Sequence, residues 1–229
     1  MAYGIRPQIN STIMKKIIVS LAFTLVLFVA KAQNERFVKA MEGTLLQMKG
    51  FSDKSTVEDW QMLANQFERI GNAEAKEWLP NYWAAYCYTL MGFMAKENAD
   101  KDKFVDKAKE VYAKAEKISP ANNDELMTLK AYIAQAHMVV DPMSRWMTDG
   151  PTFTESIEKA KAANPENPRP YILQGVSLYY TPEQFGGGKA VACPIMKKAK
   201  EKLANFKPAS TIHPAWGEYN LTMVKAECE

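Results

Sequence analysis

The chain has 229 residues, of which 47% are hydrophobic, and it carries 29 Lys and Arg against 26 Asp and Glu. Four of the bases and none of the acids precede residue 33, namely Arg6, Lys15, Lys16 and Lys31, so residues 33–229 carry 25 basic against 26 acidic side chains. Because these residues have neither a surplus nor a cluster of Lys and Arg, we do not expect a nucleic-acid-binding protein.

Residues 14–32 have the three parts of a secretory signal peptide. Lys15 and Lys16 form a basic head, which is followed by an apolar run and then by a small-residue exit. We therefore predict cleavage between Ala32 and Gln33. The mature chain is then expected in the periplasm or outside the cell.

The residues around this segment raise two further points. Residues 1–13 lack periodicity and precede a second methionine, Met14, so we interpret them as a disordered upstream extension. The alternative interpretation of the apolar run is a transmembrane anchor, but a spanning helix needs about 20 apolar residues. This run is shorter and ends at Lys31. Residues 33–229 are expected to form a single domain with no membrane span.

Apolar residues recur at the three- and four-residue spacing of amphipathic helices along most of the remaining chain. Glycines and prolines separate the periodic stretches. We predict helices over residues 34–49, 55–79, 81–96, 100–118, 122–140, 153–163, 169–180 and 189–206, and a short closing helix over 214–228. Residues 141–150 are predicted to be a loop outside any helix.

Three alanines each stand five residues before a proline that joins two helical patterns. The pairs are Ala75 and Pro80, Ala115 and Pro120, and Ala160 and Pro165. Such regularly spaced corners are typical of stacked helical hairpins. The predicted fold is all-α: a right-handed α-α superhelix, or solenoid, of about four helical hairpins with a C-terminal capping helix.

The second helices of two hairpins share one spacing of residues. Steps of four, three and five join Ala108, Tyr112, Ala115 and Pro120, and likewise Phe153, Ile157, Ala160 and Pro165. In this spacing the chain resembles the tetratricopeptide repeat (TPR) family, whose small residues let paired helices approach closely. Tyr171 and Gly175 match residues of that family's first helix, whereas Lys130 stands where a small residue is expected.

More narrowly, the chain resembles exported repeat proteins of Gram-negative bacteria. The segments that carry this resemblance are FERI, AEAKEWLPNYW, DPMSRW, NPENPRPY and TPEQFGGGKA. The resemblance implies a TPR-like domain in the cell envelope, and it implies no particular ligand.

Motifs that would indicate catalysis are missing from the sequence. Residues 185–189, FGGGK, precede a predicted helix, but no strand comes before them and Ala190 replaces the Ser or Thr of a phosphate-binding loop. His137 and His213 have no second histidine at metal-ligand spacing. We therefore predict a non-enzymatic protein with no cofactor and no metal.

The three cysteines have different expected states. Cys87 lies in the most apolar predicted helix, where a buried free thiol is usual. If the last two helices fold back on each other, Cys193 and Cys228 reach the same level, and an exported protein allows a disulfide between them. The alternative, in which the two side chains point apart, stays open.

The architecture favours a protein–protein interaction scaffold that binds a peptide or protein segment on its inner face. Inner-face candidates are Trp83, Met127, Arg169 and Tyr179. Arg145 and Trp146, in the predicted loop, are candidate anchors for a partner. In the alternative interpretation of this loop, Trp146 covers the array and Arg145 bonds helix-end carbonyls.

An alternative function is that of a small-ligand-binding or transport-accessory protein. Its binding site would be an apolar, aromatic-lined pocket near Tyr82, Trp83 and Tyr86. A deep cavity would favour this function, and a filled core would exclude it.

Overall fold

The computed structural model describes residues 35–51, 54–225 and 228. The predicted extension over 1–13, the signal peptide over 14–32 and the cleavage site between Ala32 and Gln33 lie outside the described residues. The chain divides into two compact units, residues 1–40 and 41–229. Residues 35–40 of the first unit are helical.

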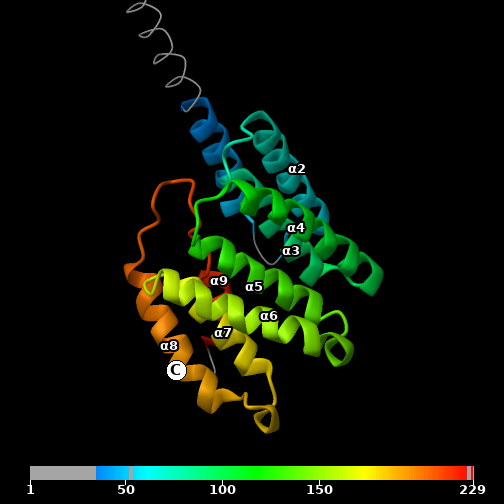
Figure 1. The fold of residues 1–229 in the computed structure, drawn as a ribbon, viewed down its shortest axis with the longest axis vertical. Helices are drawn as coiled ribbons and strands as arrows, with labels where there is room; N and C mark the ends of the chain where they lie inside the picture. The colour runs from blue at the N-terminus through cyan, green and yellow to red at the C-terminus, as the bar shows by residue number, and fades with distance from the viewer. Residues whose placement is uncertain (1–34, 52–53, 226–227, 229) are drawn as a thin grey trace, which may run out of the picture. The chain divides into compact units, whose positions relative to one another are not determined.

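Every regular element among the described residues of the second unit is a helix (Figure 1). The elements are a helix over 41–49, α2 (Val57–Ala73), α3 (Leu79–Met94), α4 (Asn98–Ile118), α5 (Asp124–Met138), α6 (Pro142–Ala163), α7 (Pro168–Tyr180), the 3-10 helix η1 (Glu183–Phe185), α8 (Lys189–Asn205) and α9 (Glu218–Lys225). None of the helices in the described ranges is long and apolar enough to cross a membrane.

Consecutive helices pair into hairpins, and the hairpins stack in chain order. The most extensive contacts join α3 to α4, α5 to α6, and α7 to α8. Contacts between α3 and α5 and between α5 and α7 form a second set that runs along the stack. We call α3, α5 and α7 the inner layer. The predicted all-α array of stacked hairpins is confirmed.

Side chains just before the helices determine where several of them begin. Thr56 and Asp59 cap α2 reciprocally, since each side chain bonds the backbone N–H of the other residue. The Asn123 side chain accepts hydrogen bonds at the start of α5, and the Asn167 side chain does so at the start of α7. These caps fix the corners between successive hairpins.

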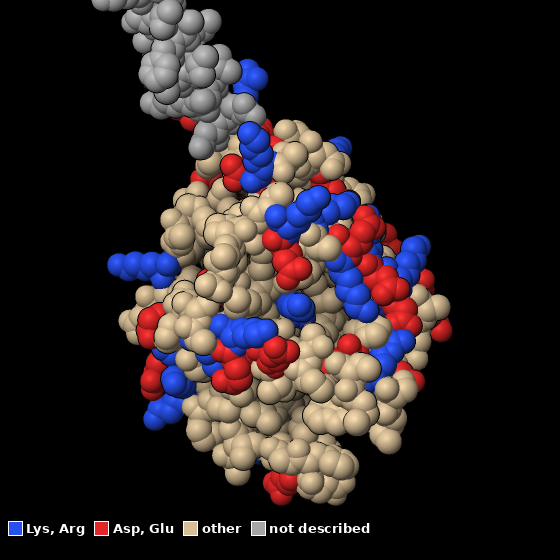
Figure 2. Space-filling model, viewed as in Figure 1, with Lys and Arg blue, Asp and Glu red and all other residues tan. Residues whose placement is uncertain are grey.

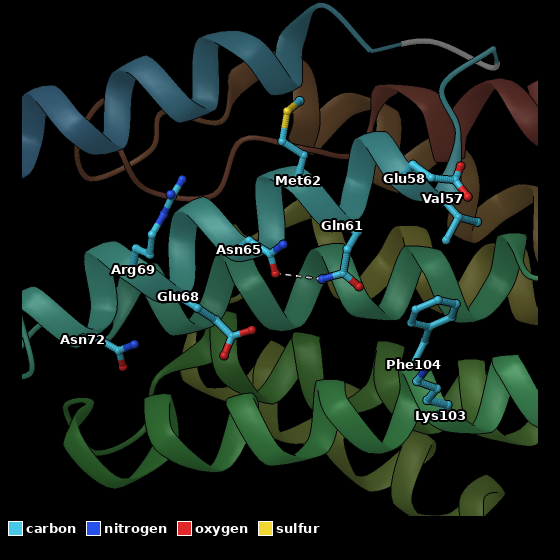
Figure 3. Close-up of a pocket in the computed structure, with 10 residues that line it drawn as sticks. All are labelled: Val57, Glu58, Gln61, Met62, Asn65, Glu68, Arg69, Asn72, Lys103 and Phe104. Carbon is cyan, nitrogen blue, oxygen red and sulfur yellow. Dashed lines mark hydrogen bonds between the residues drawn. The ribbon is translucent and has the colours of Figure 1, made fainter.

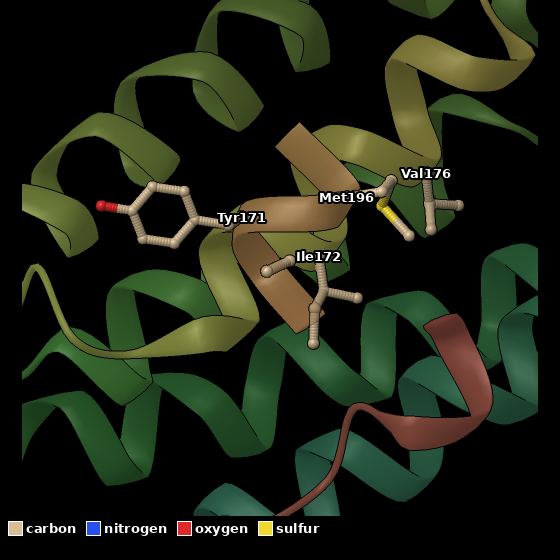
Figure 4. Close-up of a cluster of buried hydrophobic side chains, with 5 residues drawn as sticks. Tyr171, Ile172, Val176 and Met196 are labelled. Carbon is tan, nitrogen blue, oxygen red and sulfur yellow. The ribbon is translucent and has the colours of Figure 1, made fainter. Parts of the chain in front are cut away.

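Small residues allow α7 and α8 to approach closely. Figure 4 shows Met196 of α8 beside Ile172 and Val176 of α7, in a cluster of buried apolar side chains. A Cβ added to Gly175 would overlap the Met196 side chain, so only glycine leaves room there. Ala199, also in this cluster, is fully buried.

The prediction of a loop over residues 141–150 is wrong, because these residues form the first turns of α6. Pro142 occupies the first turn, where its missing N–H is not needed, and the Asp141 side chain caps the helix by accepting from the Ser144 N–H (3.3 Å). Pro151 lies inside the helix without ending it. The loop prediction treats Pro142 as a break, although a proline in the first turn is a helix-start signal.

The predicted closing helix over 214–228 is too long, since α9 begins only at Glu218. Residues 206–217 have no regular helix and lead from α8 to α9. A disulfide joins Cys193 of α8 to Cys228, with their Cα atoms 5.1 Å apart. The C-terminal segment, residues 206–225, is thus followed by a covalent link back to α8.

Candidate functional site

A cavity of about 720 Å³ opens on the inner layer of the array. All three inner helices contribute to its walls, and α3 alone supplies Tyr86, Leu90, Phe93 and Met94. Side chains from residues 48–60 close one side, and residues of α9 close another. This volume lies within the range of roughly 300–1,000 Å³ that is typical of small-molecule sites.

Stacked aromatic rings form one wall of this pocket. Tyr132 of α5 stacks on Trp216 of the C-terminal segment, with ring centroids 5.6 Å apart and planes 19° apart. Tyr86 lies 5.2 Å from the same Trp216 ring, and Phe93 lies 5.1 Å from Tyr132. The Trp216 indole N–H donates to the Tyr82 hydroxyl (2.8 Å). Tyr86, Phe93 and Tyr132 line the pocket, and Trp216, which does not line it, packs against Tyr86 and Tyr132 and holds their rings in place.

Other residues add further aromatic rings and thioethers to the lining. Phe51 and Trp60 meet edge to face at 5.0 Å, and both line the pocket. Three methionines complete the apolar lining, namely Met48, Met94 and Met138. Methionine adapts its shape to what it contacts and packs favourably against rings.

The described residues that line the pocket are all uncharged. Burial raises the pKa of Tyr132 to about 12 and raises that of Tyr86 well above its usual value, so both phenols keep their protons at neutral pH. Amide and hydroxyl groups supply the remaining polarity. One of them, the Asn220 side-chain amide, donates to the Tyr132 hydroxyl (3.4 Å).

The pocket has a closed end and an open end. Leu173 and Val176 of α7 are buried within it, and Leu173 is only 1% exposed. Tyr180 and Tyr219 also line it, yet they are 61% and 65% exposed. Large apolar side chains that gather in solvent usually mark a binding site. We define these two tyrosines, with the half-exposed Met94, as the mouth of the pocket.

The C-terminal segment lies against the inner layer. The Trp83 indole N–H donates to the backbone carbonyl of Ile212 (2.9 Å). The Arg169 guanidinium lies 4.5 Å from the centre of the Phe206 ring. Both Trp83 and Arg169 are buried. The expectation that these two residues face an open groove is therefore wrong, because the chain's own C-terminal segment covers them.

Arg169 also forms a buried ion pair. Its Nε atom donates to Glu125 of α5 (2.8 Å), and its Nη2 atom bonds the same carboxylate. The Asn167 side chain donates to Glu125 as well (3.2 Å). This buried ion pair joins α5 to α7, while the Nη1 atom of Arg169 is buried without a hydrogen-bond partner among the described residues.

Arg145 and Trp146 lie on α6, away from the pocket. Arg145 pairs with Asp102 of α4 (Nη2 to Oδ2, 2.8 Å) and donates to the His137 carbonyl at the end of α5 (3.1 Å). The alternative role for Arg145, bonding a helix-end carbonyl, matches this geometry. Trp146 is 56% exposed.

The other two inner-face candidates do not line the pocket either. Met127 and Tyr179 are half-buried, and Tyr179 contacts the mouth residue Tyr180 edge to face at 5.1 Å. Of the residues named for the alternative apolar pocket, Tyr86 lines the cavity. Tyr82 and Trp83 are buried close to Tyr86 but do not line the cavity. The Trp83 ring contacts the Tyr86 ring, and the Tyr82 hydroxyl accepts a hydrogen bond from Trp216.

The sequence contained a signal for some of the pocket-lining residues that were not predicted. On α5, Tyr132, Gln135 and Val139 follow one another at steps of three and four, beside the buried seam of Leu126, Leu129, Ile133 and Ala136. This second stripe could have been read as a pocket wall. Trp216 and Tyr219 carried no such signal, because their place depends on how the chain returns across the array.

A second hollow lies between α2 and α4 and is wide and polar (Figure 3). Its side chains bond one another, as in the hydrogen bond from the Gln61 amide to Asn65 (2.9 Å). Gln61 also donates to the Tyr88 hydroxyl (3.1 Å), which in turn donates to Glu68 (2.6 Å). Charges of both signs are intermingled on the face in Figure 2. The apolar pocket is therefore the better candidate site.

Metal chemistry finds little support among the described residues. No group of three His, Cys, Asp or Glu side chains is placed there to hold a metal ion. His137 bonds Asp149 (2.7 Å), and His213 bonds the Ser210 hydroxyl (2.7 Å). Neither histidine lines the apolar pocket.

Comparison with known proteins adds one informative match. No model of a protein family matches the chain. No curated protein sequence matches it either. Among solved structures, the chain is similar to the HusA haemophore from Porphyromonas gingivalis, with 31% sequence identity and a TM-score of 0.71. The match covers 84% of this chain and 94% of that one. Membership of the TPR family stays a prediction.

Proposed function

The chain belongs to the family of the HusA haemophore, and from this we propose that it carries haem or a related tetrapyrrole in the apolar pocket of its inner layer. A haemophore is by name a carrier of haem. The observation that supports the proposal is the pocket itself, which is uncharged, aromatic and open at one end. A solid core at this place would have left the chain without a site for such a ligand.

The chemistry of the lining suits a large flat ring. Tyr86 and Tyr132 present π-faces or edges that Trp216 holds in position. Aromatic pairs contribute about 0.5–1.5 kcal/mol beyond the burial of their area. A porphyrin in this pocket also buries apolar surface, which contributes roughly 25 cal/mol per Å². Together these terms support binding without any charged residue.

Iron in the ring has few protein ligands within reach. Haem iron is held in proteins by His, Cys, Met or Tyr side chains. The described lining has no His or Cys, and its buried Tyr86 and Tyr132 are protonated, which leaves the thioethers of Met48, Met94 and Met138 and the exposed hydroxyls of Tyr180 and Tyr219. In our proposal the protein therefore binds haem mainly through contacts with the porphyrin ring, and iron ligation contributes less to the affinity.

The proposal extends to the compartment and the type of protein. The signal peptide over residues 14–32 supports an exported carrier, in which haem is cargo and undergoes no reaction. A scaffold that binds a peptide on the inner face has less support. That face holds the chain's own C-terminal segment, which covers Trp83 and Arg169.

Titration of the purified chain with haem, followed by the absorbance of the porphyrin, tests this function. We expect saturable one-to-one binding. Tyr132→Ala should weaken it by about 10-fold or more, because the variant removes a stacking ring from the wall. The matched control is Trp146→Ala, which removes an exposed aromatic residue outside the pocket.

Two outcomes would contradict the proposal. Absence of haem binding by the unmodified chain would reject the function. An equal loss in Trp146→Ala and Tyr132→Ala would reject the site. Circular dichroism of both variants separates loss of the ligand site from loss of the helical fold.

A further inference from the structure

Resting on the proposed function, we propose that the pocket selects tetrapyrroles by where their carboxylates lie on the ring. In this proposal an uncharged edge enters the pocket, and the edge that bears the carboxylates stays in solvent at the mouth. Ligands with carboxylates on every pyrrole are then excluded by charge, because no orientation keeps all of the carboxylates outside.

Among the described residues, the buried end of the pocket has no side chain that would compensate a negative charge. Its buried walls are Leu173 and Val176 of α7 and the protonated phenols Tyr86 and Tyr132. A carboxylate that enters this end loses its hydration and meets no cation of the described lining. Burial of such an unpaired ion is strongly unfavourable.

The polar groups of the lining are neutral, and two of them already have partners. The Asn220 amide donates to the Tyr132 hydroxyl (3.4 Å), and the Thr181 hydroxyl donates to the Ser177 carbonyl (2.9 Å). Neutral donors of this kind can orient a ligand, but they stabilise a buried anion far less than a guanidinium does.

The buried cation of the inner layer does not change this conclusion. Arg169 is not among the residues that line the pocket, and its charge is balanced by Glu125. Its guanidinium packs over Phe206 (4.5 Å) and Trp216 (5.8 Å). Its Nη1 atom has no hydrogen-bond partner among the described residues, but the side chain is fully buried, so a ligand carboxylate could reach it only by displacing the C-terminal segment.

The mouth is suited to the charged edge. Tyr180 and Tyr219 line the pocket and are largely exposed, so ligand substituents beside them remain in water. Carboxylates at this position keep their hydration and cost little. The orientation of the ring is set by the difference between the buried, uncharged end and the solvent-exposed mouth.

A set of metal-free porphyrins tests this selectivity on the unmodified chain. Protoporphyrin IX has its carboxylates on two neighbouring pyrroles, whereas coproporphyrin III has one on each pyrrole. We expect coproporphyrin III to bind at least about 100-fold more weakly than protoporphyrin IX, since part of its charge must enter the pocket. The tetramethyl ester of coproporphyrin III, which is bulkier but uncharged, should regain most of the affinity.

The outcomes separate this inference from the function on which it rests. Equal affinity for protoporphyrin IX and coproporphyrin III would overturn the inference while leaving tetrapyrrole binding intact. An ester that is excluded as strongly as the acid would overturn it too, because bulk and not charge would then select. Failure of every porphyrin and of haem to bind would reject the proposed function itself.

Discussion

Tyr132 shows how one residue couples the binding site to the stability of the fold. Its ring forms part of the aromatic wall with Trp216, and its hydroxyl accepts a hydrogen bond from Asn220 of α9. Burial raises its pKa from about 10 to about 12. Burial also raises the pKa values of Tyr82 and Tyr86. The folded chain therefore holds these protons more tightly than the unfolded chain does.

Alkaline pH should destabilise the fold through these phenols. Below pH 10 both states keep the protons, and the contribution is fully present. As pH rises from about 10 toward 12, the unfolded chain releases protons that the folded chain retains, so the free energy of unfolding falls. Urea unfolding at pH 8, 9.5 and 11 measures this. Tyr132→Phe should show a shallower decline, and an identical decline in both proteins would exclude a role for Tyr132.

The helix pairs depend on small residues at the points of closest approach. The α7–α8 pair has Gly175 against Met196, and Ala115 and Ala160 are fully buried in the preceding hairpins. Ala115 and Ala160 belong to the spacing that predicted the stacked array, whereas Ala75, the third alanine of that spacing, is exposed in the turn between α2 and α3. The spacing therefore carried information about packing at two of its three positions. The loop predicted over residues 141–150 was wrong because a proline can either start a helix or end one. The sequence alone does not distinguish these two cases.

Substitutions of two glycines test the close approach. Gly175→Ala places a methyl group against Met196 and should lower the free energy of unfolding by about 1–3 kcal/mol. Gly43→Ala is the matched control, because nothing lies within 4 Å of its added Cβ. That variant should be neutral or gain up to about 1 kcal/mol from helix propensity. Both values come from urea unfolding, and equal effects would show that packing at Gly175 is not limiting.

At the scale of the molecule, the C-terminal segment packs against helices that are distant from it in the sequence. Local patterns predicted each hairpin and the stack, because those contacts join neighbours in the chain. Nothing local indicated that residues 206–225 return across the inner layer, where Trp216 meets Tyr86 and Tyr132. The candidate site could therefore be only half predicted: Tyr86 from an unusually apolar helix, but not the wall that Trp216 supports.

The disulfide links this returning segment to the array, and it should matter for the pocket as well as for stability. Cys193 and Cys228 are 35 residues apart, and closing a loop of that length stabilises a fold by about 3–4 kcal/mol in the chain-entropy account. The loop contains Tyr219 and Asn220, which line the pocket. Releasing the link should therefore loosen one pocket wall.

Cys193→Ser tests this link through two measurements. We expect the free energy of unfolding to fall by about 3–4 kcal/mol and bound haem to dissociate faster, because α9 then detaches more readily from the inner layer. A reductant added to the unmodified chain should reproduce both effects and should leave Cys193→Ser unchanged. Cys87 is a free, buried thiol in either case, and Cys228 becomes a second free thiol once Cys193 is replaced. If reduction changed stability but not the dissociation rate, the C-terminal segment would be a structural brace with no part in holding the ligand.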